Sequence, residues 1–321
     1  MRLKKRLTKE GTAHERSFAE RFALVLLLFP LCVLAEQPVI VNLVEDAMQD
    51  YQFEEGAPLL EIIFPRVISS DCAILRFEDQ VMMIDSSTHS EKMNNRIQTA
   101  CQTVGVDHID IAYNSHPHND HIDGFPDINE QMPIGKFITT FPDDFDFHIK
   151  QVTDYMREHD IPIERVYNGD VMQLGDGSVT LTVIQEPRES WPLNDQSAML
   201  MVQYGSRRIL FTGDNENRSQ KYYVENPPAC GLNADILKYP HHGQVKLNND
   251  FLALISPSLA FLDGAADAVK EGAKYCQKND LPYLLSYKGL TRLRTDGKIW
   301  VVDYLKEENA DRELPYTPSR E

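Results

Sequence analysis

Cysteine is scarce and scattered in this chain of 321 residues. Its five cysteines are far apart and none belongs to a C-x-x-C pair, so their spacing gives no disulfide framework. A domain of this size can be stable without disulfide bonds. We therefore interpret the cysteines mostly as thiols of the core.

Clustered positive charge is also missing from most of the chain. Lys and Arg number 32 against 49 Asp and Glu, which gives a formal net charge of −17. Because binding to nucleic acid draws on clustered Lys and Arg, this acidity argues against broad affinity for nucleic acid, although a local basic groove is compatible with it. With 42% hydrophobic and 25% charged residues, the composition is that of a globular protein rather than a disordered one.

Long hydrophobic runs are scarce as well. The apolar run over residues 22–35 has about 14 residues, which is short for a membrane span of roughly 20. It follows a basic flank and ends at Ala35, a pattern typical of a secretory signal peptide cleaved after that residue. An uncleaved N-terminal membrane anchor is the alternative, because the charged flank is long and Pro30 interrupts the run.

We expect the mature protein to begin near Glu36 outside the cytoplasm, in a secreted or periplasmic location. An uncleaved N-terminal segment would be the part of the chain that contacts a membrane. N-terminal sequencing of the purified protein checks this expectation. Recovery of intact Met1 from a soluble cytoplasmic fraction would contradict it.

Strand and helix patterns organise the rest of the chain. The first half is predicted to contain three strands, a helix and a further strand, near residues 59–64, 72–77, 81–85, 90–103 and 108–114. After residue 171 the strand pattern restarts and then alternates with helices. We infer two β-rich halves with outer helices, an α/β/β/α sandwich. The expected organisation is a signal peptide or anchor over residues 1–35, an acidic and polar linker over 36–57, the α/β domain over 58–305, and a polar tail over 306–321.

Four potential metal ligands lie within six residues, in the pattern H-x-H-x-D-H formed by His116, His118, Asp120 and His121. In an extended segment residues two apart share a side, so His116 and His118 can reach one ion. After the bend, Asp120 and His121 can reach a neighbouring ion. The cluster follows the strand expected over residues 108–114, and α/β proteins place their chemistry at strand ends. The pattern therefore predicts a site for two metals.

Two later motifs also follow predicted strands. Asp214 ends an apolar strand in the sequence T-G-D, where its carboxylate could bridge two divalent ions. His241 and His242 follow another strand, where one imidazole could complete the shell of the second metal. T-G-D is a common turn and paired histidines are often plain loop residues. The first cluster favours the interpretation of both motifs as ligands.

Taken in this order, the motifs H-x-H-x-D-H, N-D-Q-S-A-M-L, I-L-F-T-G-D and D-I-L-K-Y-P-H-H-G resemble those of the metallo-β-lactamase-fold superfamily. Within it, the chain is similar over about residues 58–304 to the branch that contains the C-terminal domain of ComEC-type DNA-uptake proteins. The combined motifs are specific for the fold and much less so for the substrate. The resemblance implies an α/β fold of four layers, an αββα sandwich with the metal site at one edge of the sheets.

The resemblance also implies a role for each ligand. His116 and His118 would hold the first metal, Asp120 and His121 the second, and Asp214 would bridge the two. The remaining roles fall to His241 or His242, as a late ligand or proton donor, and to Asp85, which would orient the histidine cluster. Zinc suits the nitrogen and oxygen ligands best, and the share of carboxylates keeps manganese as an alternative.

The chain departs from the superfamily's pattern at two places. Many members have another histidine between the first cluster and the bridging aspartate, where this chain has Asn194 and Asp195. ComEC-like domains also tend to carry a G-H-P after the strand that follows H-H-G, whereas this chain has Asp263 and no histidine there. Either Asn194 or Asp263 could replace a missing ligand, or the position could stay open.

The reaction that the resemblance favours is hydrolysis by a metal-bound hydroxide, since a bound divalent ion lowers the pKa of water from about 16 toward 7. Asp120 would orient the hydroxide, and whichever of His241 and His242 is unligated would protonate the leaving group. The expected substrate is a small molecule with a phosphodiester, ester or amide-type bond, because the acidity weighs against long nucleic acid. The alternative is a secreted binding protein that keeps the fold without catalysis.

Overall fold

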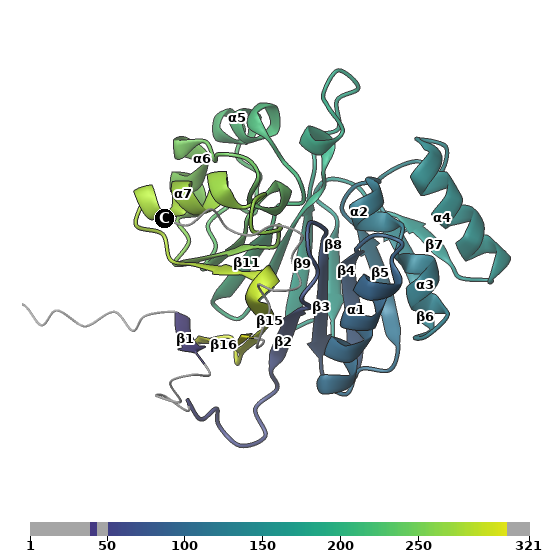
Figure 1. Ribbon diagram of the computed structural model, residues 1–321, viewed down its shortest axis with the longest axis horizontal. Coiled ribbons are helices and arrows are strands. Elements are labelled where there is room, and N and C mark those ends of the chain that lie inside the picture. Colours follow the sequence, from purple (N-terminus) through teal and green to yellow (C-terminus); the bar gives the residue numbers. More distant parts are fainter. Residues whose placement is uncertain (1–38, 44–50, 307–321) are drawn as a thin grey trace, which may run out of the picture. The chain divides into compact units, whose positions relative to one another are not determined.

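The structure is a computed structural model that describes residues 39–43 and 51–306 of the chain (Figure 1). The signal peptide or anchor expected over residues 1–35 and most of the tail expected over residues 306–321 lie outside the described residues. Cys32 lies outside them too. Within the described part of the chain, no helix is long and apolar enough to cross a membrane.

The strands of the described residues form two sheets. One has nine strands in the order β1-β16-β15-β2-β3-β4-β5-β6-β7, and the other has seven in the order β14-β13-β12-β11-β10-β9-β8. The first sheet contains β1 (Val39–Leu43), β2 (Leu60–Phe64), β3 (Cys72–Phe77), β4 (Gln80–Ser86), β5 (Ile109–Asn114), β6 (Ile134–Thr139), β7 (Ile163–Arg165), β15 (Gly289–Thr295) and β16 (Trp300–Lys306). The second contains β8 (Val171–Leu174), β9 (Val179–Ile184), β10 (Met199–Tyr204), β11 (Arg207–Phe211), β12 (Ile236–Lys238), β13 (Leu259–Leu262) and β14 (Tyr283–Leu285).

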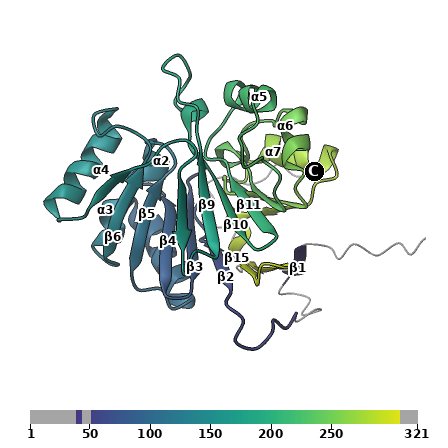
Figure 2. The same ribbon diagram turned by 180° about the vertical axis from the view of Figure 1, so that it is seen from behind.

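Helices cover the outer face of each sheet (Figures 1 and 2). Those on the first sheet are α1 (Glu91–Thr103), α2 (Asn119–Ile122), α3 (Phe125–Asn129) and α4 (Phe147–Glu158). Those on the second are α5 (Asn217–Glu225), α6 (Asn249–Ile255) and α7 (Lys270–Lys278). Three short 3-10 helices complete the described elements, η1 (Asn194–Gln196), η2 (His241–Gly243) and η3 (Ser286–Lys288).

The alternation of side chains along each strand explains why each sheet packs against the other sheet on one face and against helices on the other. In β2, Ile62 and Phe64 point into the core between the two sheets, while Ile63 points into the core under the outer helices. Successive side chains of a strand face opposite sides of a sheet, so strands that are apolar on both faces need cover on both. Phe64 lies over Phe261 of the second sheet, with ring centroids 4.0 Å apart. The predicted four-layer αββα sandwich is confirmed.

Each outer layer has its own core. The buried side chains Ile97 of α1 and Ile149 of α4 belong to the apolar cluster on the first sheet. Tyr223 of α5 and Phe251 of α6 belong to the cluster on the second sheet. The helices therefore bury apolar stripes against the sheets, and burial of this kind supplies the main favourable term in folding.

The edge strand β1 corrects one expectation. Residues 36–57 were predicted to form a linker, but Val39–Leu43 pairs in parallel with Trp300–Tyr304 of β16. The partner strand lies more than 250 residues away in the sequence, so no local pattern signals the pairing. Strands β15 and β16 in turn return to the first sheet, where β15 runs antiparallel to β2.

Parallel pairing places the predicted ligands at one edge of the sandwich. Strands β4, β5, β6 and β7 are parallel neighbours in the first sheet, and β11, β12, β13 and β14 are parallel neighbours in the second. The carboxyl ends of parallel strands lie at the same edge, where α/β proteins bind ligands. Asp85 lies at the carboxyl end of β4 itself. The loops after β5, β11, β12 and β13 carry, respectively, the H-x-H-x-D-H motif, Asp214, the His241-His242 pair and Asp263.

Candidate metal centre

The first cluster of histidines leaves β5 in an extended segment. His116 is fully buried, and its Nε2 lies 3.0 Å from Nδ1 of His118. His118 is the N-cap of the short helix α2, which contains Asp120 and His121. The rings of His116 and His121 are 4.1 Å apart, so the bend brings the two halves of the motif together.

Asp214 lies at the centre of the site. Its Oδ1 is 3.3 Å from Nε2 of His121, and its Oδ2 is 3.8 Å from Nε2 of His116. Oδ2 is also 3.8 Å from Nε2 of His241 and 3.7 Å from Nε2 of His242. One buried carboxylate therefore faces four imidazole nitrogens, drawn together from the ends of three strands.

Three polar atoms at this point are buried and have only ion-pair contacts at 3.3 Å in place of a hydrogen bond of ordinary geometry. They are Nε2 of His121, Nε2 of His242 and Oδ1 of Asp214. Buried polar atoms almost always have a partner, and each unpaired one costs about 1–3 kcal/mol. A divalent cation bound by these nitrogens and this oxygen would satisfy all three, so the residues fit the metal that the motif predicts.

The ligands form two groups that share Asp214. His116, His118 and Asp214 are close enough to one another to hold one ion, and His121, His242 and Asp214 to hold another. Asp120 belongs with the second group, since its Oδ2 lies 3.3 Å from Nε2 of His242. Such a pair of adjoining groups suits two divalent ions bridged by one carboxylate.

Asp71 also lies near the second group, but it faces the wrong nitrogen for a ligand. Its Oδ2 is 3.5 Å from Nδ1 of His121, whereas the nitrogen that points at Asp214 is Nε2. The same Nδ1 is 2.8 Å from Oδ2 of Asp85. We therefore place Asp71 behind the ring, together with Asp85, rather than among the ligands.

The charges of the site set the protonation of its rings. Burial lowers the pKa of His116 well below its usual value, so that ring is neutral. Burial acts in the same direction on His121, but Asp214 outweighs it and raises the pKa well above the usual value. At His242 burial is likewise outweighed, by Asp214 and Asp263, which raise the pKa to about 10. Burial favours a neutral Asp214, but the surrounding imidazoles hold its pKa well below the usual value.

Asp85 lies behind the first cluster, where the resemblance implied an orienting role for it. It is the second-last residue of β4 and lies in the left-handed region, with φ of 55°; it accepts hydrogen bonds from the backbone N–H of Ser115 at 2.8 Å and from its hydroxyl at 2.6 Å. With Nδ1 of His121 at 2.8 Å, Asp85 fixes that ring so that Nε2 faces inward. A carboxylate behind a ligand histidine sets its tautomer and direction.

A close approach behind the cluster explains the D-G sequence that follows it. A Cβ placed on Gly124 would lie 2.1 Å from the backbone oxygen of Ser86. Gly124 also donates its N–H to the backbone oxygen of Ser87 at 3.3 Å. Because only a residue without a side chain fits, the segment that carries the ligands packs directly on the end of β4.

Both late histidines have a left-handed backbone conformation. His241 has φ of 48° and His242 has φ of 53°. The ring of His242 is fully buried, with Nδ1 3.3 Å from Oδ1 of Asp263. The ring of His241 is 24% exposed, with Nδ1 2.7 Å from Oε1 of Glu216. Their surroundings assign His242 to the buried second group and His241 to the open side of the site.

The side chains at the two positions that depart from the superfamily's pattern contact different residues of the site. Asp263 contacts the outer nitrogen of His242, so it does not replace a ligand. Asn194 donates from Nδ2 to Glu216 at 2.9 Å and lies 3.4 Å from Nδ1 of His241. Neither side chain takes the place of the missing histidine, and the first group keeps an open side near His118 and His241.

A family model described as the metallo-beta-lactamase superfamily matches residues 65–258, more than half of the chain. The protein belongs to the metallo-beta-lactamase superfamily. The ComE operon protein 3 of Bacillus subtilis (strain 168) is 26% identical to it over 199 residues, which are 60% of this chain and 24% of that relative. The superfamily resemblance and its ComEC-like character are confirmed. The chain spans about a quarter of the relative's length.

Solved structures agree on the fold of this superfamily member. The crystal structure of CmlA, a diiron beta-hydroxylase from Streptomyces venezuelae, superposes with a TM-score of 0.52 at 12% sequence identity. The match covers 76% of this chain and 55% of that chain. At this identity the likeness shows the shared fold, and the chemistry has to be argued from the residues of this chain.

Sequence reasoning missed three charged residues around the centre of this superfamily member. They are Asp71, which precedes β3, Lys238, which ends β12, and Glu216, which follows the T-G-D turn. Lys238 did carry a signal, since it is a charged residue in the apolar strand D-I-L-K-Y and is 2% exposed. A lysine at a buried strand position needs an anionic partner, and that requirement points to a carboxylate across the site.

We expect His118→Ala to lower the amount of metal bound by the purified protein. The side chain lies in the first ligand group, so its loss should weaken one of the two metal positions and spare the other. The fall in bound metal, close to one ion per chain, can be measured by elemental analysis after dialysis against limiting zinc. Excess zinc should also stabilise the variant less than the parent protein, for which zinc at 100 times its Kd adds about 2.7 kcal/mol.

His108→Ala is the matched control for this variant. His108 lies before β5, at the opposite end of the strand from the cluster, and pairs with Asp107 and Asp110 on the surface. It should keep the metal content of the parent protein. Equal metal content in the His118→Ala variant and the parent would show that His118 is not a ligand.

Proposed function

We propose that this protein is an exported metal-dependent hydrolase that cleaves a phosphodiester or another small ester or amide-type bond. The observation that supports it most directly is the convergence of four imidazoles on Asp214, with three buried atoms left for a cation to satisfy. The resemblance to ComEC-type proteins favours a phosphodiester over the other bonds. Zinc is the metal we expect, with manganese as the alternative.

The site is buried on one side and open on the other. His116, His121 and His242 are fully buried, and the side chain of Asp214 is 2% exposed. By contrast, the side chain of Asp120 is 31% exposed and that of His241 is 24% exposed. Catalytic metal sites keep an open position for water and substrate, whereas structural sites are closed. This asymmetry supports catalysis.

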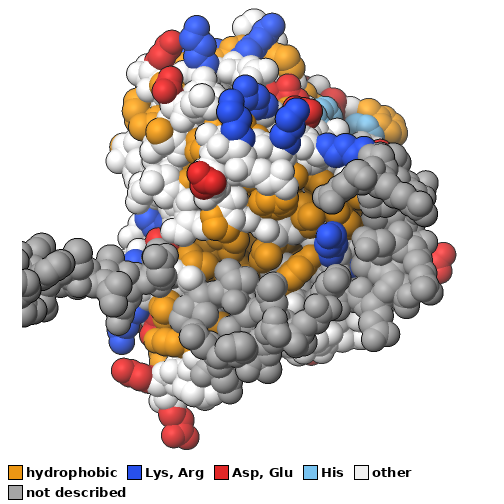
Figure 3. Space-filling view, turned by 60° about the vertical axis from the view of Figure 1, so that its left-hand side comes forward, with side chains coloured by type: hydrophobic (Ala, Val, Ile, Leu, Met, Phe, Trp, Pro, Cys, Tyr) orange, Lys and Arg blue, Asp and Glu red, His pale blue; other side chains and the backbone are white. Residues whose placement is uncertain are grey.

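The surface of the molecule is less one-sided in charge than the net charge suggests. On the face shown in Figure 3, Lys and Arg side chains lie among Asp and Glu side chains in the upper part. The negative charge is therefore not uniform over the molecule, and the net charge alone does not exclude an anionic substrate.

A bound divalent ion would lower the pKa of a water and polarise the bond to be cleaved. The side chains of the protein would orient the water and donate the proton. Asp120, at the open edge, is placed to accept a hydrogen bond from the attacking water and so to orient it. His241, held at Nδ1 by Glu216, is placed to donate a proton from Nε2 to the leaving group. His242 is the buried ligand.

Hydrolysis of bis-p-nitrophenyl phosphate by the purified protein tests this proposal. We expect turnover after addition of zinc or manganese, and loss of turnover after treatment with EDTA. A parallel assay with nitrocefin separates a phosphodiesterase from a lactamase. No turnover of either compound with either metal would favour the alternative, a secreted binding protein without catalysis, for which the missing histidine at Asn194 is the supporting observation.

The role of His241 gives a sharper prediction. His241→Ala should lower kcat about 100-fold while the bound metal stays unchanged, because loss of a general acid costs roughly 10²–10⁴ in rate. The loss should be larger for a phosphodiester with an alkoxide leaving group than for one with p-nitrophenolate, which needs less protonation. Metal content by elemental analysis and kcat on both substrates check the prediction.

Glu216→Gln provides the matched control, since it keeps the size of the side chain 2.7 Å from Nδ1 of His241 and removes its charge. It should show a smaller fall in kcat with the same dependence on the leaving group. If His241→Ala instead lost bound metal, His241 would be the third ligand of the first group and the proton would have to come from another residue.

A further inference from the structure

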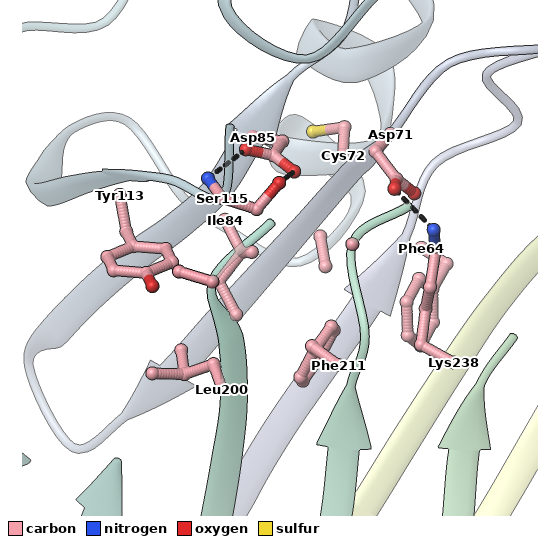
Figure 4. Close-up of a pocket in the computed structure, with 13 residues that line it drawn as sticks. Phe64, Asp71, Cys72, Ile84, Asp85, Tyr113, Ser115, Leu200, Phe211 and Lys238 are labelled. Atoms are coloured by element: carbon pink, nitrogen blue, oxygen red, sulfur yellow. Dashed lines mark hydrogen bonds and ion pairs between the residues drawn. The ribbon is translucent and has the colours of Figure 1, made fainter. Parts of the chain in front are cut away.

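Behind the ligands lies a buried lysine that links the two sheets. Lys238 ends β12 of the second sheet and is 2% exposed. Its Nζ donates to Oδ2 of Asp71, which precedes β3 of the first sheet, as Figure 4 shows. It also lies 3.2 Å from Oδ2 of Asp263, which follows β13. Both carboxylates are buried, with 5% and 2% of their surfaces exposed.

Each of these carboxylates also faces the outer nitrogen of a ligand histidine. Asp71 Oδ2 lies 3.5 Å from Nδ1 of His121, beside Asp85, which binds the same nitrogen at 2.8 Å. Asp263 Oδ1 lies 3.3 Å from Nδ1 of His242. Lys238 thus stands one layer behind both buried rings of the second ligand group, with an aspartate between it and each ring.

The surroundings make this arrangement depend on the ammonium. A cavity of about 10 Å³ adjoins it, room for about one water, and its other walls include Phe64 and Phe211. Little solvent is therefore available to the two buried carboxyl groups. Without the ammonium, neither Asp71 nor Asp263 would keep the cationic partner that holds it beside its ring.

Backbone contacts tie the same residues to the ligand segment. Asp71 donates its N–H to the backbone oxygen of Asp120 at 3.1 Å and accepts from the N–H of Ser87 at 2.7 Å. The backbone oxygen of Lys238 accepts from the hydroxyl of Thr212 at 2.7 Å. A shift of Asp71 would therefore move the segment that carries Asp120 as well as the ring of His121.

We propose that Lys238 is a positioning residue of the metal centre: its ammonium holds Asp263 against Nδ1 of His242, and holds Asp71 beside Nδ1 of His121, which Asp85 binds directly, so that both rings keep Nε2 toward Asp214. The inference rests on the proposed metal centre and not on the proposed reaction. A carboxylate behind a ligand histidine is worth about 10–100-fold in metal affinity. Lys238 directly supports the carboxylate behind His242, and it acts on His121 through Asp71, which lies beside Asp85 at that ring.

Lys238→Met tests the inference, because it keeps the length of the side chain and removes the charge. We expect the zinc affinity of one position to fall about 10–100-fold and that of the other to change less than threefold. Zinc titration against a competing chelator, at a temperature far below unfolding, measures both affinities without substrate. The Tm in EDTA should also fall by about 10 °C, because the buried carboxyl groups lose their cationic partner.

Two further variants separate positioning from stability. Asp71→Asn combined with Lys238→Met should recover part of the Tm, because it removes one of the carboxylates left unbalanced, while zinc affinity stays low. It also provides a folded protein if the single variant does not fold. Lys136→Met, which breaks a surface ion pair with Glu164 at 2.8 Å, is the matched control and should leave the zinc affinity unchanged.

The outcomes are distinct. A Lys238→Met variant that loses Tm but binds zinc as tightly as the parent would overturn the inference and leave a purely structural lysine. Zinc binding that falls as expected in a protein without phosphodiesterase activity would overturn the proposed reaction and support the inference. A parent protein that binds neither zinc nor manganese would overturn both.

Discussion

Asp214→Ala should abolish both metal binding and turnover. The carboxylate of Asp214 faces the Nε2 atoms of His116, His121, His241 and His242 at 3.3–3.8 Å, so it is the group that both ligand sets share. Its loss removes one oxygen ligand from each position and leaves the imidazoles facing one another. We expect metal affinity to fall more than about 100-fold, and turnover to fall below detection, since the two ions act as a unit.

Stability should respond in the same variant. His121 and His242 have their pKa raised by Asp214, so in the metal-free protein their positive charges lose a buried partner when it is removed. Removal of one partner of a buried ion pair costs roughly 3–5 kcal/mol in the free energy of unfolding. Chemical denaturation in EDTA measures this cost, and zinc titration measures the loss of binding.

Asp144→Ala, a change at an exposed position of a surface loop, is the control for the loss of a carboxylate and should behave like the parent protein. Retention of full phosphodiesterase activity by Asp214→Ala would rule out hydrolysis by two bridged metals. A protein that still bound two ions with parental affinity would show that Asp214 does not bridge.

Most of the fold could be predicted from the sequence, because the alternation of apolar residues in strands and their spacing in helices are local patterns. The strands expected near 72–77 and 171–174 have the bounds Cys72–Phe77 and Val171–Leu174 in the structure. Alternation and turn residues are read within a few positions, so these elements need no tertiary information. The strand Val39–Leu43 was missed because it is an edge strand whose pairing with β16 joins opposite ends of the chain.

The candidate site was predictable where its residues are close in sequence. The H-x-H-x-D-H motif showed four side chains in one segment, and the resemblance added Asp214 and the histidine pair. Lys238 and Asp71 were missed because they lie 167 positions apart and meet only when the sheets pack face to face. A sequence shows that a charged residue sits in an apolar strand, but it does not show which carboxylate will face that residue.

The choice between the two late histidines also needed the structure. Their order in the sequence, His241 before His242, does not show which ring turns inward. The left-handed conformation of both residues sends one ring to Glu216 and the other to Asp263. Such a conformation is costly for residues with a Cβ, by about 1–3 kcal/mol each, and it persists where the surrounding structure holds it.

Metal binding should be coupled to the release of protons, and this coupling gives opposite effects of pH on the metal-free and the metal-loaded protein. Asp214 raises the pKa of His121 well above its usual value and, with Asp263, raises that of His242 to about 10. Both rings therefore carry a proton on Nε2 at neutral pH when no metal is bound. A cation needs those lone pairs, so each ring must release one proton on binding.

For the metal-free protein, the raised pKa values decide whether stability rises or falls with increasing pH. A raised pKa in the folded state stabilises the protein fully below the unfolded value of about 6.5, and the stabilisation is lost as the pH rises toward the folded value. The metal-free protein should therefore become less stable from about pH 7 toward pH 10. For metal binding the direction is reversed, and the Kd for zinc should fall up to about 100-fold per pH unit near neutrality, because two protons compete with the metal.

Thermal unfolding in EDTA and zinc titration with a competing chelator, each at several pH values between about 6 and 8.5, measure the two trends. His242→Asn should change the slope of log Kd against pH from about −2 to about −1, because one of the competing protons disappears with the ring. Its metal-free form should also lose less stability as the pH rises. A Kd for zinc that does not change with pH, or a metal-free protein that gains stability toward pH 8.5, would show that the two rings are neutral before the metal arrives and that Asp214 does not hold their protons.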